Sequence, residues 1–323
     1  MDTAKLCVVA SYAAGLSIEV DQLPRPEETR IGRGFVLGPG GKGSNQAIQA
    51  ARLGADVALV ACVGDDLYGR EALRLWDEEG IPTDHVARTS QHQTGVALIL
   101  VEDSGRNLIA IDPGANHALE PRLLDDAAPA FECSSVCLVQ LEIPLASASY
   151  ALKAAKEAGC LTIFNPAPAQ PVPEHVWPYV DIVTPNKGEA EVVSGLKGTE
   201  EEIGRKLADK VNVAAIVTLG EEGALVVDKA GRMERVPAAE VAAVDTTGAG
   251  DAFNGALAVR IAEGSDVIDA VRWGTAAGGL ACTAHGVVPA LARRESLTGL
   301  LKRVCGRPGT QSTLPMRDGG SEV

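Results

Sequence analysis

The sequence predicts an α/β fold in which a doubly wound, mostly parallel sheet is flanked by helices. Short runs of β-branched and other apolar residues alternate with stretches of helical periodicity along most of the chain. This alternation is typical of strand–helix–strand units, which build parallel sheets. With 323 residues, of which 46% are hydrophobic, the chain is long enough to bury a full core.

The expected strands and helices alternate in order. The expected strands are Leu6–Ala10, Val57–Val63, Val136–Leu141, Leu161–Phe164, Ile182–Thr184, Ala214–Leu219 and Ala224–Val227. The expected helices are Gln46–Leu53, Gly69–Glu79, Ala146–Ala158, Lys187–Ser194, Glu200–Lys210 and Ala252–Glu263.

Two regions interrupt this rhythm. Ser17–Leu37 and Thr94–Ile111 show strand-like alternation with turn residues and no crossover helix. Open α/β sheets bind ligands at the carboxyl ends of their strands. We therefore expect segments of about 13–37 and 93–111 to form a small β-sheet that covers these ends as a lid. Such a lid would exclude water from the site. An ordinary hairpin excursion is the alternative.

Composition narrows the class of protein. A net charge of −14 argues against nucleic-acid binding, which needs a basic face. The seven cysteines form no CxxC pair and suit a reducing compartment. Since neither a secretory signal nor an apolar run of about 20 residues is found, we expect a cytoplasmic protein without a membrane partner. We expect one domain over residues 1–305 and a disordered tail over 306–323.

The most informative motif is Asp245-Thr-Thr-Gly-Ala-Gly-Asp251, at the start of an expected helix. Free backbone amides at a helix N-terminus attract anions, and Gly248, Ala249 and Gly250 are small enough to let a phosphate approach them. Asp251 could then accept the proton of an attacking hydroxyl. This combination suits phosphoryl transfer to an alcohol. The alternative is an acidic residue that only complements the helix dipole, worth about 0.3–1 kcal/mol.

A second glycine-rich loop, from Gly38 to Gln46, precedes another expected helix. It lacks the residue order of a Walker A loop. Its glycines would let a small polyol approach the backbone, and Lys42 and Asn45 offer polar contacts to hydroxyls. The alternative is a flexible turn in which Ser44 or Asn45 caps the helix.

Three further positions follow expected strands. Asn186 and Glu189 lie three residues apart in a first helical turn, so they could act through water on magnesium, or form a capping box. The turn Thr218-Leu-Gly220-Glu-Glu-Gly223 could admit a nucleotide to the main chain, or be an ordinary turn. Glu142 ends an apolar strand, where it could meet a substrate hydroxyl or solvent.

These motifs occur in the order typical of one family. Together with Gly64-Asp-Asp and Asn165-Pro-Ala-Pro, they closely resemble the ribokinase-like (PfkB) carbohydrate kinases over roughly residues 5–300. The resemblance implies ATP-dependent phosphorylation of a sugar's terminal hydroxymethyl group.

The resemblance also assigns roles position by position. Asp251 matches the catalytic base, and Gly248, Ala249 and Gly250 match the anion hole. Gly41, Lys42, Asn45 and Glu142 match sugar contacts, while Asn186, Thr218, Gly220 and Gly223 match nucleotide contacts and Glu189 acts on magnesium through water. An activating monovalent cation, usually potassium, would be held by Asp245, Thr247, Ala281, Ala284 and Gly286. An exposed lid edge needs covering, so a homodimer through the lid is expected.

One stretch departs from the family. Ribokinase-like enzymes usually carry Gly-Ser-x-Asn-x-Asp after the first strand, and its Asn and Asp hold sugar hydroxyls. Here Ala13 and Gly15 stand at these two positions. Each unpaired hydroxyl would cost about 1–3 kcal/mol, so we expect ribose to be a poor substrate. A deoxygenated or differently branched sugar, or one with a substituent that fills the room at Gly15 and stacks on Tyr12, would fit better; Tyr12 could also pack in the core.

Two other functions remain open. A nucleoside kinase shares the anion-hole motif, although the intact Gly-Gly-Lys-Gly-Ser-Asn-Gln segment favours a free sugar. A catalytically silent binding protein would not need Asp251 and its glycines, which are present.

Overall fold

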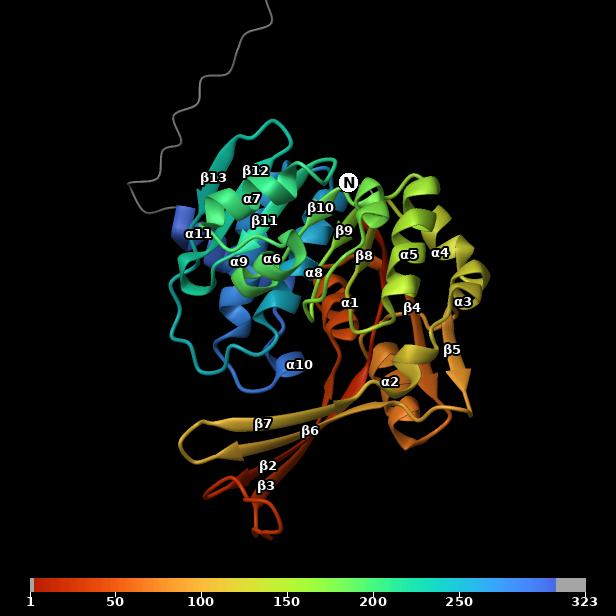
Figure 1. Cartoon of the computed structure of the whole chain (residues 1–323), viewed down its shortest axis with the longest axis vertical. Helices are drawn as coiled ribbons and strands as arrows, with labels where there is room; N and C mark the ends of the chain where they lie inside the picture. The colour runs from red at the N-terminus through yellow and green to blue at the C-terminus, as the bar shows by residue number, and fades with distance from the viewer. Residues whose placement is uncertain (1–2, 306–323) are drawn as a thin grey trace, which may run out of the picture.

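The computed structural model describes residues 3–305, without the side chains of the last three, and two sheets organise it (Figure 1). The strands are β1 (Lys5–Val9), β2 (Ala13–Val20), β3 (Arg33–Gly40), β4 (Asp56–Gly64), β5 (Val86–Thr89), β6 (Gly95–Glu102), β7 (Asn107–Asp112), β8 (Val136–Val139), β9 (Leu161–Phe164), β10 (Ile182–Val183), β11 (Ala214–Thr218), β12 (Ala224–Asp228) and β13 (Met233–Val236). The helices are α1 (Lys42–Arg52), α2 (Leu67–Glu78), α3 (Pro121–Asp126), α4 (Ala128–Glu132), α5 (Leu145–Glu157), α6 (Lys187–Ser194), α7 (Glu200–Ala208), α8 (Ala249–Ala262), α9 (Val267–Ala281), α10 (Val287–Ala290) and α11 (Arg294–Cys305). The tail expected over 306–323 lies outside the described residues.

The large sheet has the strand order β13-β12-β11-β10-β9-β8-β1-β4-β5. Its strands run parallel except at one end, where β11, β12 and β13 form an antiparallel meander. The predicted doubly wound, mostly parallel sheet is therefore confirmed.

Alternate side chains of each central strand feed two separate cores. In β1, Leu6 and Val8 join the core under α1, α2, α8, α9 and α11, whereas Cys7 and Val9 join the core under α3 to α7. This follows from the period of two along a strand. Because both faces of the sheet are covered, its strands read as continuous apolar runs rather than as alternating ones.

The small sheet has the order β3-β2-β6-β7 and projects away from the large sheet (Figure 1). β2 pairs antiparallel with β3 and parallel with β6. The expected second sheet is confirmed, although its strands reach beyond the regions of alternation, to Ala13 at one end and Gly40 at the other.

Several elements differ from the sequence-based expectation. α1 begins at Lys42 rather than near Gln46, so neither Ser44 nor Asn45 caps it. α9 was not predicted, because it is rich in small apolar residues and lies buried between other elements without a strongly amphipathic pattern. No helix within residues 3–305 is long and apolar enough to cross a membrane.

Candidate active site

Two helices at the site begin at glycines rather than at capping side chains. The N-cap of α1 is Gly41 and that of α8 is Gly248, and neither end has a side-chain cap. In contrast, Asp66 caps α2 and Asn186 caps α6. At α1, however, Glu142 and Ser11 accept hydrogen bonds from the first amides. The start of α8 is the one of the two that leaves backbone amides available to a ligand.

The turn before α8 requires glycine at one position and leaves space at another. Gly248 has a φ of 81°, and a Cβ there would lie 2.3 Å from Cγ1 of Val287. A Cβ on Gly250 would meet nothing within 4 Å. In the described part of the chain, the amides of Gly250 and Asp251 have no acceptor, whereas Ala249 donates to the Thr246 carbonyl at 3.3 Å. The two open amides therefore belong to residues that line a cavity.

Asp251 is buried in the first turn of α8 and only 6% exposed. Its two carboxylate oxygens accept hydrogen bonds from Asn45 Nδ2 at 2.8 Å and Gln46 Nε2 at 3.1 Å. Burial raises the pKa of Asp251 to about 6, although the Lys42 ammonium and the two amides oppose this rise. A carboxyl with this pKa can accept a proton near neutral pH.

A chain of polar side chains supports Asp251 from behind. Gln46 Nε2 also donates to Asn165 Oδ1 at 3.1 Å, and Asn165 Nδ2 donates to the Thr184 carbonyl at 2.9 Å. Thr184 Oγ1 donates to Asn254 Oδ1 at 2.6 Å, and Asn254 Nδ2 donates to the Gly250 carbonyl at 2.8 Å. This chain joins the carboxylate to the turn that carries the open amides.

The sequence analysis gave none of these supporting residues a role. Asn165 directly follows β9, and Thr184 directly follows β10, so adjacent parallel strands place them at one edge of the sheet. Asn254 lies three residues after Asp251 and therefore shares its helix face. These positions, after adjacent strands and on the helix face of Asp251, are the signals in the sequence that could have identified the supporting residues.

Lys42 projects into the cavity beside Asp251. Burial acts to lower the pKa of its ammonium, but three carboxylates outweigh burial and hold this pKa above its ordinary value; they belong to Asp251, Glu142 and Glu189. The cavity has a volume of ≈ 220 Å³. It is lined by Lys42, Asn165, Ala167, Thr184, Asn186, Glu189, Thr218, Thr246, Gly248, Gly250, Asp251 and Asn254.

Glu142 lies on the other side of Lys42. Its Oε2 accepts hydrogen bonds from Ser11 Oγ at 2.6 Å and from the Lys42 amide at 2.7 Å. Gly41 has a φ of 94°, and a Cβ there would lie 2.6 Å from the Cα of Tyr12. The glycine-rich loop is thus pressed against the end of β1, and its carboxylate partner is half-buried rather than solvated.

Asn186 and Glu189 form the capping box that sequence analysis gave as the alternative. Asn186 Oδ1 accepts from the Glu189 amide at 2.9 Å, and Glu189 Oε2 accepts from the Asn186 amide at 2.8 Å. Both residues also line the cavity. Burial raises the pKa of Glu189 against the opposing effects of this hydrogen bond and of Lys42, so a nearby cation would favour its charged form.

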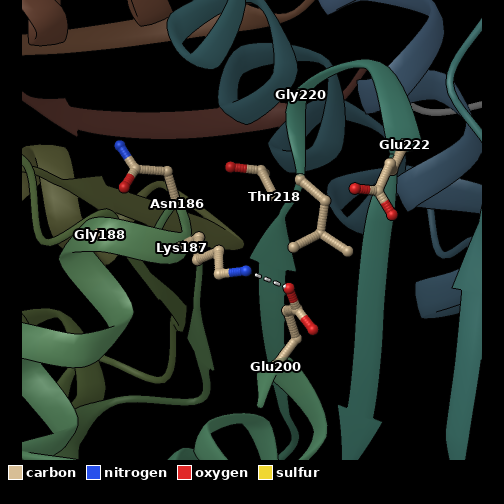
Figure 2. A pocket seen from close by; sticks show the side chains of 8 residues that line it. Asn186, Lys187, Gly188, Glu200, Thr218, Gly220 and Glu222 are labelled. Carbon is tan, nitrogen blue, oxygen red and sulfur yellow. Dashed lines mark hydrogen bonds and ion pairs between the residues drawn. The ribbon is translucent and has the colours of Figure 1, made fainter. Parts of the chain in front are cut away.

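A second pocket of ≈ 250 Å³ adjoins the cavity and shares Asn186 and Thr218 with it. On its wall, the Lys187 ammonium is paired with Glu200 (Figure 2), and the two charged groups are 2.6 Å apart. Gly220 also lines this pocket. Gly223 is not among its lining residues; a Cβ there would lie 2.0 Å from the Val236 carbonyl oxygen, so glycine is needed for strand packing.

Three of the five residues expected around a monovalent cation, Asp245, Thr247 and Gly286, come together next to the α8 turn. Asp245 accepts from the Thr247 amide at 2.9 Å and from the Gly286 amide at 3.3 Å. Ala281 ends α9, and the turn containing Ala284 leads to Gly286. Burial acts to raise the pKa of Asp245, but hydrogen bonds from Thr247 and Gly286 lower it below its ordinary value.

Tyr12 packs in the core, the alternative that the sequence analysis left open. Its ring meets Trp76 edge-on with centroids 5.6 Å apart, and it is 3% exposed. Tyr12 therefore does not stack on a sugar. Ala13 and Gly15 follow it in β2 and are partly accessible.

Comparisons with known proteins agree with this geometry. Residues 3–293 match the model of the pfkB family carbohydrate kinases. The chain is 36% identical to ribokinase of Haemophilus influenzae, over 92% of this chain and 98% of that protein. It is 36% identical to deoxyribokinase of Salmonella typhi, over 83% and 89% respectively. The structure of Arabidopsis thaliana ribokinase complexed with ribose and ATP matches with a TM-score of 0.88 at 29% identity, over 93% of this chain and 99% of that one.

Proposed function

Because the chain belongs to the pfkB family of carbohydrate kinases, we propose that it transfers the γ-phosphoryl group of ATP to the terminal hydroxymethyl of a small sugar, with Asp251 as the base. The observation that carries this proposal is the position of Asp251. Its buried carboxylate shares one cavity with the open amide of Gly250 and the ammonium of Lys42.

The transfer needs a proton acceptor for the alcohol and positive charge for the phosphate. Asp251 accepts the hydroxymethyl proton while that oxygen attacks the γ-phosphorus, and ADP leaves. The amides at the start of α8 stabilise the charge on the transferred group, because they are fixed before the substrate arrives. Asn45 and Gln46 hold the carboxylate in place.

The nucleotide occupies the second pocket and reaches the cavity past Asn186 and Thr218, which line both. Within the described residues, no three His, Cys, Asp or Glu side chains form a metal cluster. This suits magnesium, which proteins often hold through one or two carboxylates and the substrate's phosphates. Glu189 would hold it through water, and the ion would neutralise phosphate charge. Potassium would be held near Asp245, Thr247, Ala281, Ala284 and Gly286.

The small sheet acts as a lid and as the contact of a homodimer. Its outer strands β3 and β7 are uncovered edges, and it carries many exposed apolar side chains. The exposed apolar residues of the sheet are Ile18, Phe35, Val36, Leu37, Leu98, Leu108, Ile109 and Ile111. The six cysteines with described side chains are free thiols, which suits a cytoplasmic location.

The direct test is ADP release from ATP with a panel of pentoses, deoxypentoses, hexoses, tetritols and nucleosides. We expect ADP release that depends on a free sugar, with phosphate found on its hydroxymethyl group by NMR. The control without acceptor measures ATP hydrolysis. Sugar-independent ADP release, or turnover confined to nucleosides, would contradict the proposal.

A further inference from the structure

The side-chain directions at the start of the small sheet identify which of its two faces lies toward the candidate active site. Ser11 turns its hydroxyl to Glu142, whereas Tyr12 turns its ring to Trp76 on the opposite side. Side chains alternate along an extended chain, so the direction of Ser11 continues through Ala13 and Gly15 of β2. Ala14, on the other side, is buried in the core with Tyr12.

Strand register extends this face across the sheet. Ala13 pairs with Gly40 and Gly95, and Gly15 pairs with Gly38 and Ala97. A Cβ on Gly15 would lie 3.9 Å from Cδ1 of Ile99, which confirms that Ile99 shares the face. We name these residues the inner face: Ala13, Gly15, Gly38, Gly40, Gly95, Ala97 and Ile99.

The inner face offers a ligand no polar side chain. Six of its seven positions are glycine or alanine, and the seventh, Ile99, adds a branched alkyl group. By contrast, the polar side chains of the candidate site come from outside the small sheet: Lys42 and Asn45 from α1, Asp251 from α8, and Glu142 from the segment after β8. A hydroxyl that is pressed against the inner face and cut off from water would lose its hydrogen bonds, whereas a C–H group would lose none.

We infer that the acceptor is a deoxysugar, whose ring turns a hydroxyl-free edge to the inner face and its hydroxymethyl group to Asp251. This inference rests on the proposed function and names the substrate class of that site. The polar side chains around Asp251 orient the hydroxyls that remain, and the inner face selects against an additional one. An apolar wall rejects an added hydroxyl only moderately, by about tenfold to a hundredfold.

The test compares ribose with 2-deoxyribose, which differ by one hydroxyl, at fixed ATP. We expect kcat/KM to be at least tenfold higher for 2-deoxyribose. Thermal shifts with each sugar and a non-hydrolysable ATP analogue give a second readout, and 2-deoxyribose should stabilise the protein at lower concentration than ribose.

Two variants place a polar group on the inner face: Ala13→Asn and Gly15→Asp. A Cβ on Gly15 would lie 3.3 Å from the Gly38 carbonyl oxygen, a tight but tolerable contact, and Ala13→Asn avoids it. Each should move the ratio of kcat/KM values toward ribose by about tenfold and leave the KM for ATP unchanged. Ile18→Asn is the matched control, because Ile18 lies in the same strand on the opposite face; it should leave the ratio unchanged.

The outcomes separate the two ideas. The inference is overturned if the wild-type protein prefers ribose, or if it prefers nucleosides to deoxysugars. It is also overturned if both inner-face variants fold and leave the ratio unaltered. In each case the proposed kinase activity still stands. An equal change in Ile18→Asn would also overturn the inference. If no acceptor releases ADP, the proposed function fails instead, and the order of the thermal shifts still decides the inference.

Discussion

The cavity around Asp251, here called the α8 wall or polar wall, and the inner face of the small sheet, which we infer to be the second wall of the site, differ in the chemistry of their side chains. On the α8 wall, Asp251, Asn45 and Gln46 form a buried hydrogen-bonded network behind open backbone amides. On the small-sheet wall, the inner face carries only glycine, alanine and isoleucine. Under the proposed function the reaction depends on the fixed polar groups, and under the further inference the choice of acceptor depends on the polar groups that the inner face lacks.

The largest loss of activity is expected from a substitution of Asp251 on the polar wall. Asp251→Asn removes the proton acceptor while keeping nearly the same shape, so kcat should fall by roughly a thousandfold or more. The affinity for ATP, measured by isothermal titration, should change less than about threefold. Near-normal kcat would exclude Asp251 as the base.

Glycines of the polar wall should divide into two kinds. Gly248→Ala forces a side chain onto a φ of 81° and into Val287, so it should lower the unfolding free energy by roughly 1–3 kcal/mol and abolish most turnover. Gly250→Ala has free space, and alanine favours helix by about 0.5–1 kcal/mol. It should therefore preserve or raise stability in urea unfolding while lowering kcat, since the methyl group enters the phosphate site. Equal losses of stability would contradict this division.

The buried base should also reduce the stability of the free protein. The pKa of Asp251 rises from an ordinary value of 3.8 to about 6 on folding. The ionisation of Asp251 therefore lowers the free energy of unfolding progressively as the pH rises from 3.8 to about 6, and the loss stays constant at higher pH. Relative to the wild type, Asp251→Asn should thus gain up to about 3 kcal/mol of unfolding free energy from pH 3.5 to pH 8. Urea unfolding at both pH values measures the gain. A gain that is larger at low pH would show that the shift has the opposite sign.

The apolar wall should give the smallest effect. Ile99→Val removes one methylene, worth about 0.8 kcal/mol if the acceptor covers it, or a change of roughly three- to fourfold in kcat/KM for the acceptor. The KM for ATP should not change. Leu98→Ala, a truncation in the same strand on the other face, is the control and should leave acceptor kinetics unaltered.

Sequence alone predicted the parallel sheet and its extra small sheet, because periodicity along the chain reflects burial on one or both faces. It also predicted the residues of the catalytic wall, since the Asp245–Asp251 motif and the Gly38–Gln46 loop are local in sequence. It gave the supporting residues Asn165, Thr184 and Asn254 no role, because only contacts between distant segments connect them to Asp251.

The sequence by itself determined that this chain carries the Asp245–Asp251 motif and the glycine loop of a pfkB-family carbohydrate kinase, since each depends on neighbouring residue types. Only the tertiary structure decided how they act together. In the folded chain, Asn45 and Gln46 donate hydrogen bonds to Asp251, and Tyr12 packs in the core against Trp76. Ala13 and Gly15 pair with the glycines of β3. The physical reason is that burial and strand register join residues far apart in the chain, so the pKa of the base and the polarity of each wall arise only on folding.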